Sequence, residues 1–149
     1  MIYIKQDLIK IVGLSSKIDP KVVGITATTA TVKNALNYVN TIKKVLPNAL
    51  TVIGDSHPTF MPTKTLKAEE SLDVVVVGEE DKTIVEISEE YEKNLKSFSE
   101  INGMVYIANN KINITPPRHL IKNLDDLPFL QGILYRSKLI QSQKIRQEE

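Results

Sequence analysis

Three short apolar segments, each followed by a polar turn and then a helical pattern, constrain this sequence most strongly. They are Val22–Ala27, Leu50–Ile53 and Asp73–Val77. β-Branched residues dominate them, and the first segment is almost continuously apolar, which is typical of parallel strands that helices bury on both faces. The connections between them are long enough for right-handed βαβ crossovers. The sequence therefore predicts an α/β fold, a doubly wound (Rossmann- or flavodoxin-like) three-layer sandwich with a core of parallel strands.

Helical periodicity fills the segments around these strands. Apolar residues recur every three or four positions in four predicted helices, Lys5–Ser16, Val32–Val45, Pro62–Glu69 and Asp81–Lys96. The threonines of Thr28–Thr31 offer hydroxyl N-caps for the second helix, and Pro47 ends it. We therefore expect a helix after each of the three strands.

The apolar pattern changes to strict alternation after Ser97. Met104–Ile107 and Ile112–Thr115 predict two more strands, and Asn109 and Asn110 between them tolerate the positive φ angles of a tight turn. The sequence therefore predicts a C-terminal antiparallel hairpin beside the parallel core. We expect one α/β domain over residues 1–129 and a polar tail over residues 130–149.

The composition excludes several classes of function. Lys and Arg total 19 against 18 Asp and Glu, and the resulting net charge of +1 gives no field that would attract nucleic acid. The 149 residues contain no cysteine, which excludes disulfides, thiolate zinc sites and iron–sulfur clusters within them. No apolar run approaches the ~20 residues that span a bilayer, and the first residues do not resemble a secretory signal. We therefore expect a cytoplasmic protein that binds neither nucleic acid nor membrane.

Polar side chains gather where the predicted parallel strands end. The most informative exit follows the second strand, where Asp55, Ser56 and His57 place a carboxylate, a hydroxyl and an imidazole in one turn. Open α/β sheets bind their ligands outside the carboxyl ends of their strands. The three strand exits are therefore candidate loops for a single binding edge.

Each of these polar groups also has a purely structural interpretation. Thr26, Thr28 and Thr29 either bind a ligand or cap the helix that follows them. His57 either contacts a ligand or forms a hydrogen-bonded cap, and the carboxylates of Glu79–Asp81 favour a helix N-terminus with or without a ligand. The sequence leaves both interpretations open.

Five segments follow one another over about residues 21–129, namely VVGITATT, TVIGDSHPTF, LDVVVVGEEDKTIVEI, INGMVYIANNKI and TPPRHLIKNLDDLPF. Their order resembles the cobalamin-binding domain that precedes the barrel in cobalamin-dependent radical-SAM enzymes. In the second, the family usually has glycine, glycine, proline, histidine, a small residue and threonine. The chain matches this pattern at Gly54, His57, Thr59 and Phe60. It departs from the pattern at Asp55, Ser56 and Pro58.

Two later segments carry further parts of the resemblance. The family commonly has glycine, glutamate, glycine and glutamate after its third strand, and Gly78 and Glu79 match while Glu80 replaces the second glycine. The closing pattern is matched by Pro117, Arg118, Leu124, Asp125, Leu127, Pro128 and Phe129.

The resemblance implies a cobalamin-binding-like module of a radical-SAM type system. In that family the cobalt and the barrel perform the chemistry, so the chain is expected not to be catalytic by itself and to need a partner subunit with the radical-SAM barrel. The implied cofactor is cobalamin, and no catalytic residue or protein ligand to a metal is implied. The implied cofactor-binding residues are Thr26, Thr28, Gly54, Asp55, His57, Thr59, Gly78 and Glu79.

The chain also departs from the family at both ends. No counterpart of the family's first strand, helix and second strand is recognisable ahead of Val22, and neither a DxHxxG motif nor the cysteine-bearing barrel occurs. We therefore expect a truncated version of the fold, with one wall of the crevice missing and no histidine-ligated cobalamin. The strand at Val22–Ala27 would then present an open edge, which a second copy of the chain or the segment Met1–Ile4 could cover.

Three other functional classes compete with the cobalamin interpretation. The first is a non-catalytic protein-interaction or homodimerisation module that has lost ligand binding and forms a homo-oligomer through the open sheet edge. The second is a phosphoacceptor domain with Asp55 as acceptor, which lacks the acidic pair and lysine that such domains need. The third is a zinc hydrolase that uses Asp55, His57 and His119, although nothing in the sequence brings His119 to the same edge.

Overall fold

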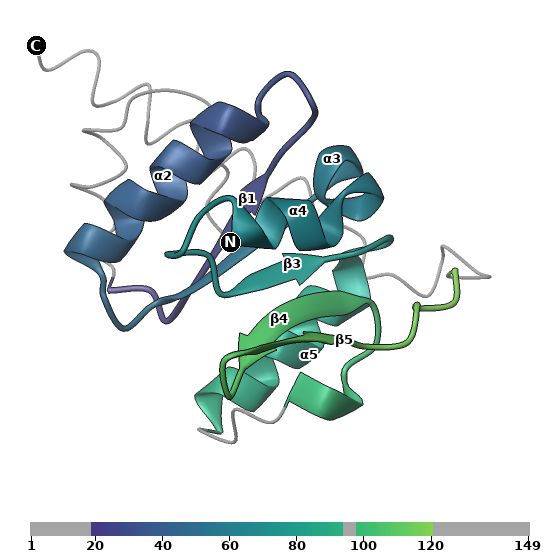
Figure 1. Cartoon of the computed structure of the whole chain (residues 1–149). Helices are drawn as coiled ribbons and strands as arrows, with labels where there is room; N and C mark the ends of the chain where they lie inside the picture. The colour runs from purple at the N-terminus through teal and green to yellow at the C-terminus, as the bar shows by residue number, and fades with distance from the viewer. Residues whose placement is uncertain (1–18, 94–97, 121–149) are drawn as a thin grey trace, which may run out of the picture. The chain divides into compact units, whose positions relative to one another are not determined.

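A five-stranded sheet forms the centre of the fold (Figure 1). Its strands follow one another in sequence order, β1 (Val22–Thr26), β2 (Leu50–Gly54), β3 (Val74–Val76), β4 (Met104–Ala108) and β5 (Lys111–Ile114). The first three strands are parallel, β4 runs antiparallel to β3, and β5 runs antiparallel to β4. The predicted fold class, a parallel α/β core with a C-terminal antiparallel hairpin, is confirmed.

This computed structural model describes residues 19–93 and 98–120. The description below concerns the first of two compact units, Met1–His119. The predicted helix over Lys5–Ser16 and the predicted domain boundary at Phe129 lie outside the described residues. The predicted end at Lys96 for the helix that begins at Asp81 is wrong, because this helix ends at Glu92 with Lys93 as its C-cap. No helix in the described part of the chain is long and apolar enough to cross a membrane.

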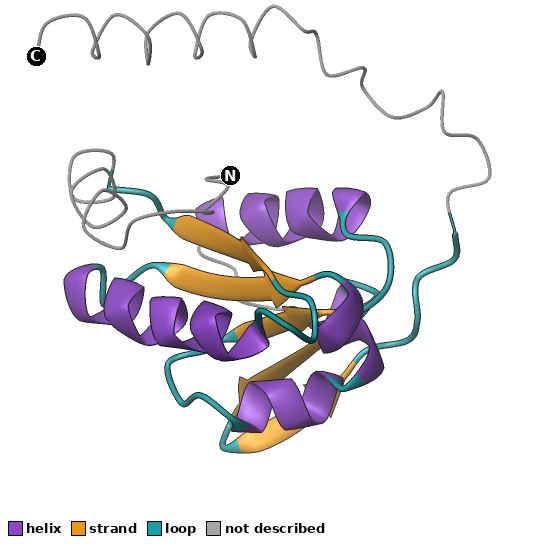
Figure 2. Cartoon of the chain, turned by 90° about the horizontal axis from the view of Figure 1, so that it is seen from above, coloured by secondary structure: helices purple, strands orange, loops and turns teal. Residues whose placement is uncertain are grey.

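Helices cover both faces of the sheet, as Figure 2 shows from above. Helices α2 (Val32–Val45) and α4 (Pro62–Lys67) pack on one face, while α5 (Asp81–Glu92) and the short 3-10 helix η1 (Phe98–Glu100) pack on the other. Alternate strand residues point to opposite faces, so β3 sends Val75 to the first cluster and Val74 and Val76 to the second. Burial of each such side chain contributes about 1.5–3 kcal/mol.

The two longer helices follow the predicted apolar patterns. Helix α2 has the predicted bounds, and its buried residues are Ala35, Val39 and Ile42. Helix α5 starts at the predicted Asp81 and buries Ile87. A short helix that the sequence did not predict, α3 (Ser56–Phe60), follows β2 directly.

The hairpin turn adopts the predicted conformation. Asn109 and Asn110 have φ angles of 52° and 58°, the left-handed region that asparagine tolerates better than most residues. The turn connects Ala108 to Lys111, which are paired across the two strands. The prediction of a tight turn at these asparagines is confirmed.

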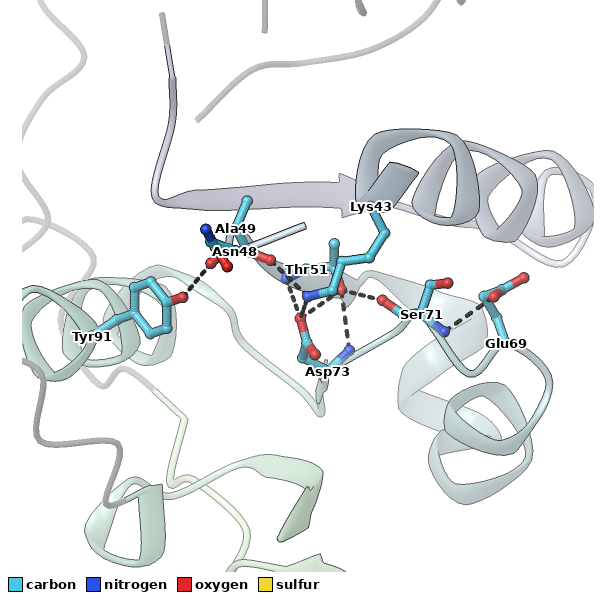
Figure 3. Close-up of polar contacts among 8 residues, drawn as sticks. All are labelled: Lys43, Asn48, Ala49, Thr51, Glu69, Ser71, Asp73 and Tyr91. Atoms are coloured by element: carbon cyan, nitrogen blue, oxygen red, sulfur yellow. Dashed lines mark hydrogen bonds and ion pairs between the residues drawn. The ribbon is translucent and has the colours of Figure 1, made fainter. Parts of the chain in front are cut away.

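A polar network joins α2 to the amino ends of β2 and β3 (Figure 3). Oδ2 of Asp73 accepts hydrogen bonds from Thr51 N at 2.8 Å and from Lys43 Nζ at 2.6 Å. The fully buried Thr51 hydroxyl donates to Ser71 O at 2.7 Å and accepts from Asp73 N at 3.1 Å. The network fixes the chain entering β3 against β2, and so sets which residues leave the sheet at the far ends of these strands.

We expect Thr51→Val to lower the free energy of unfolding by about 1–3 kcal/mol, because valine keeps the shape but removes the hydrogen bonds of a buried hydroxyl. Urea denaturation measures this loss. Thr41→Val is the matched control, since its hydroxyl bonds Asn37 O on a half-exposed face of α2, and it should change stability by less than about 0.5 kcal/mol. Equal losses in the two variants would contradict the structural role of Thr51.

Candidate functional site

The carboxyl ends of β1, β2 and β3 meet at one edge of the sheet, which we call the rim and which comprises the strand exits at residues 26–29, 54–59 and 78–80. Thr26 lies opposite Gly54 in the strand register. Beyond the strands, Ala27 N donates to Gly54 O at 3.0 Å and His57 N donates to Ala27 O at 3.2 Å. Backbone hydrogen bonds therefore hold the first two exits side by side.

Asp55 links the exits of β1 and β2 through its side chain. Its carboxylate accepts hydrogen bonds from Thr26 Oγ1 at 2.8 Å and from Ser56 N. Its φ of +86° lies in a region that non-glycine residues rarely adopt and that costs of order 1–3 kcal/mol. The bond from Thr26, followed by that from Ser56, lowers the pKa of the Asp55 carboxyl. Asp55 is thus held as a carboxylate across the two loops.

Helix α3 links all three exits. His57 Nδ1 forms a hydrogen bond of 3.2 Å with Thr29 Oγ1 from the exit of β1. Thr59 Oγ1 accepts a hydrogen bond of 3.1 Å from Gly78 N at the exit of β3. The unpredicted helix therefore positions both His57 and Thr59 at the rim.

The interpretation of the threonines as side-chain caps of α2 is wrong. Thr31 occupies the N-cap position, but its side chain makes no capping hydrogen bond. Its hydroxyl instead accepts from Thr28 N at 3.0 Å and lies 3.1 Å from the exposed Thr28 hydroxyl. Thr26 and Thr29 use their hydroxyls to contact the next strand exit, because Asp55 and His57 lie within reach there.

Glu80, which the sequence did not select as a site residue, lies against Gly54. A Cβ placed on Gly54 would lie 2.4 Å from Glu80 Oε1 and 2.5 Å from Glu80 Cδ. The φ of Gly54 is outside the positive region, so turn geometry does not demand glycine here, and the Glu80 carboxyl occupies the space that a Cβ would take. Glu80 is the N-cap residue of α5, yet its side chain makes no capping bond and accepts from the backbone N–H of Asp55. The Glu80 side chain therefore contacts the exit of β2 and does not cap its own helix.

Two carboxyl groups of the rim, those of Asp55 and Glu80, have pKa values displaced in opposite directions. Burial raises the pKa of Glu80, and the carboxylates of Asp55 and Asp81 add to this effect, while the bond from Asp55 N–H opposes it. Hydrogen bonds lower the pKa of Asp55. Pairs displaced in this way cluster at functional sites, although structural networks produce them as well. The rim thus carries a carboxylate and a second carboxyl group whose ionisation is disfavoured.

The eight residues predicted to bind a cofactor all lie on the three exits. The structure joins Thr26 to Asp55, His57 to Thr29 and Thr59 to Gly78, whereas Thr28 bonds only within its own loop. Their assignment as binding residues stays a prediction. The one sequence signal for Glu80 was its place in the glycine-rich pattern after the third strand.

The described residues offer no alternative metal centre. Within residues 19–93 and 98–120, no group of three or more His, Asp or Glu side chains could hold a metal ion. The zinc set of Asp55, His57 and His119 is therefore not assembled in this part of the chain. A cavity of about 690 Å³ with a mixed polar and apolar lining lies at the opposite edge of the sheet. Its Lys43 and Asp73 are paired with each other, and its Tyr91 donates to Asn48 O, as Figure 3 shows.

A mixed sheet with helices on both faces and polar loops at the carboxyl ends of its parallel strands defines an open α/β domain of the ligand-binding class. The profile of the B12 binding domain family matches residues 2–88, which is more than half of the 149 residues. The chain therefore belongs to the B12-binding domain family.

Solved structures of cobalamin-dependent radical-SAM enzymes share the fold. OxsB, a cobalamin-dependent S-adenosylmethionine radical enzyme solved with aqua-cobalamin bound, matches 76% of this chain with a TM-score of 0.66 and 18% identity. TsrM from Kitasatospora setae, a radical S-adenosylmethionine methyltransferase solved with cobalamin and a 4Fe-4S cluster bound, matches 77% of it with a TM-score of 0.63 and 15% identity. The matched regions are 16% and 22% of those chains. The resemblance predicted from the sequence is confirmed.

Curated relatives are much longer than the matched region. An uncharacterized methyltransferase of Pyrococcus horikoshii is 36% identical over 123 residues, which are 83% of this chain and 26% of that protein. The anaerobic magnesium-protoporphyrin IX monomethyl ester cyclase of Cereibacter sphaeroides is 28% identical over 120 residues, 79% of this chain and 20% of that protein. The chain thus spans about a quarter or less of the relatives it matches.

We expect Glu80→Gln to stabilise the protein at pH 7 but not at pH 4. A raised pKa means that the contribution of Glu80 to stability is complete below its ordinary pKa of 4.5 and is lost as the pH rises through the folded-state value. Glutamine keeps the shape and stays neutral at both pH values. The gain at pH 7 is about 0.5 kcal/mol, a small value because solvent screens the half-exposed carboxylate.

Thermal or urea denaturation at the two pH values measures this difference. Glu70→Gln is the control, because Glu70 is an exposed acid away from the rim and its removal changes the net charge by the same amount. A Glu80→Gln effect that is equal at pH 4 and pH 7, or equal to that of Glu70→Gln, would contradict the burial and repulsion assigned to Glu80.

Proposed function

We propose that this chain is a cobalamin-binding module of a radical-SAM type system and is not catalytic by itself. Membership of the B12-binding domain family carries the proposal. The convergence of three strand exits at one edge supports it, because ligands of open α/β sheets bind there. The proposed platform consists of Thr26, Thr28, Gly54, Asp55, His57, Thr59, Gly78 and Glu79.

The chemistry of the rim fits a corrinoid in most respects. Thr28 presents an exposed hydroxyl, His57 a half-exposed imidazole, and Gly78 a backbone without a side chain. These groups can donate to or pack against a large polar ring system without taking part in a reaction. Glu80 conflicts with a bound corrinoid, because its carboxyl fills the space beside Gly54.

The role proposed for the chain's own residues is to bind and orient. Asp55 and His57 are each bonded to a threonine of the neighbouring exit, which suits a rigid platform better than an acid, base or nucleophile that must exchange protons. A bound cobalamin would supply the reactive metal. A radical-SAM barrel, on a partner subunit, would supply the rest of the chemistry.

We expect hydroxocobalamin to give a saturable change in its absorption spectrum when titrated with the purified protein. Thr28→Trp should weaken this binding at least about tenfold, because an indole at an exposed rim position obstructs the ligand without entering the core. Lys44→Trp is the control, since it places the same indole on exposed α2 surface near the opposite edge of the sheet. No saturable change at high micromolar protein would reject cobalamin binding.

A second candidate function is a homodimerisation or interaction module. In the described part of the chain β1 pairs only with β2, so its other edge carries strand N–H and C=O groups that a second chain could pair with. Successive residues of a strand direct their N–H groups to opposite sides, and Ala27 N donates to Gly54 O beside β2. The N–H groups of Val22, Gly24 and Thr26 therefore face the unpaired edge. This function needs no ligand at the rim.

Sedimentation equilibrium tests the second function. If β1 pairs with β1 of another copy, the measured mass should approach that of two chains as the concentration rises into the micromolar range. A mass that stays at one chain over the whole range would reject edge pairing and would leave the cobalamin proposal unaffected. The cytoplasmic location expected from the sequence stays a prediction under either function.

A further inference from the structure

We propose that Glu80 is a plug at the rim, whose carboxyl occupies the approach to Gly54 and must leave before a corrinoid can bind. This inference rests on the proposed function, because it names what limits binding at the same site. It assigns a role to a residue outside the predicted platform.

The position of Gly54 makes it the natural contact point for a ligand. It is the last residue of β2, which lies between β1 and β3, so it stands at the middle of the three exits. A residue without a Cβ lets a ligand reach the backbone. In the structure this access is closed, because all three atoms of the Glu80 carboxyl group lie 2.4–2.8 Å from the point where a Cβ would stand.

The backbone of Asp55 holds the Glu80 plug in place. The Asp55 N–H donates to the Glu80 carboxyl, whereas the Asp55 carboxylate turns away to Thr26 and Ser56. The charged groups that face Glu80 are carboxylates, Asp55 from the β2 exit and Asp81 from its own helix, and both repel its ionised form. A hydrogen bond therefore competes with repulsion, so that the side chain is held in place without being locked.

Suppose that a ligand binds only when Gly54 is free. Its apparent affinity is then its intrinsic affinity multiplied by the fraction of molecules in which Gly54 is free. Removal of the side chain removes this reduction. A neutral side chain of the same shape removes the repulsion but still fills the space. The steric plug therefore predicts different results for alanine and glutamine at this position.

The first experiment titrates hydroxocobalamin with the wild-type protein, Glu80→Ala, Glu80→Gln and, as a control, Glu70→Ala. We expect Glu80→Ala to bind about tenfold more tightly than the wild type, which corresponds to about 1.4 kcal/mol. Glu80→Gln and Glu70→Ala should stay within about threefold of the wild type, which corresponds to about 0.65 kcal/mol or less.

The outcomes separate the inference from the proposed function. Equal affinities of the wild type and Glu80→Ala overturn the plug and leave cobalamin binding intact. Equal gains in Glu80→Ala and Glu80→Gln also overturn it, because charge and not occupancy of the space would then limit binding. No binding by the wild type or by Glu80→Ala overturns the proposed function and the inference together.

The second experiment needs no ligand. Gly54→Ala adds the Cβ that meets the Glu80 carboxyl, so it should lower the urea midpoint in the wild-type background and leave it nearly unchanged in the Glu80→Ala background. A double-mutant cycle across the four proteins measures this coupling. Additive effects of the two substitutions would overturn the contact on which the plug depends, whatever the titrations show.

Discussion

The parallel pairing of β1, β2 and β3 is the constraint on which the rest of the structure depends. Because parallel strands all end at the same edge, segments far apart in the sequence place Thr26, Gly54 and Gly78 around one rim. The network of Thr51, Asp73 and Lys43 at the opposite edge fixes where β2 and β3 begin, and therefore which residues leave the sheet. The rim is thus determined by hydrogen bonds at both ends of the strands.

Most of the fold follows from local signals in the sequence. The apolar stripe of α2 and the paired asparagines of the hairpin turn predict their elements because helix burial and turn conformation depend on neighbouring residues. Helix α3 was missed for a physical reason. It begins after Asp55, whose positive φ is stabilised by hydrogen bonds from Thr26 and Ser56, and the first of these partners is distant in the sequence. The threonine caps failed for a related reason, since the hydroxyls of Thr26 and Thr29 bond the next strand exit, while those of Thr28 and Thr31 bond within their own loop.

The candidate site likewise contains residues that the sequence predicts and one residue, Glu80, that it does not. The eight platform residues could be selected from the sequence because each follows a predictable strand, and the structure places them at one edge. Glu80 could not be selected, because its contact with Gly54 depends on how two exits approach each other in space. The sequence showed that Glu80 replaces a glycine of the family pattern, and the carboxylates of Glu79–Asp81 were explained by the start of a helix.

Asp55 and Glu80 are best understood as one structural unit rather than as two separate departures from the family pattern. Asp55 interacts with Glu80 through its backbone N–H and with Thr26 through its carboxylate. Asp55 acts on Glu80 in two opposite ways. Its backbone N–H donates to the Glu80 carboxyl, and its negative charge repels the ionised form of that carboxyl. The absence of a Cβ on Gly54 then gives the Glu80 carboxyl the space to reach that donor. A ligand that approaches Gly54 must therefore compete with the chain's own glutamate.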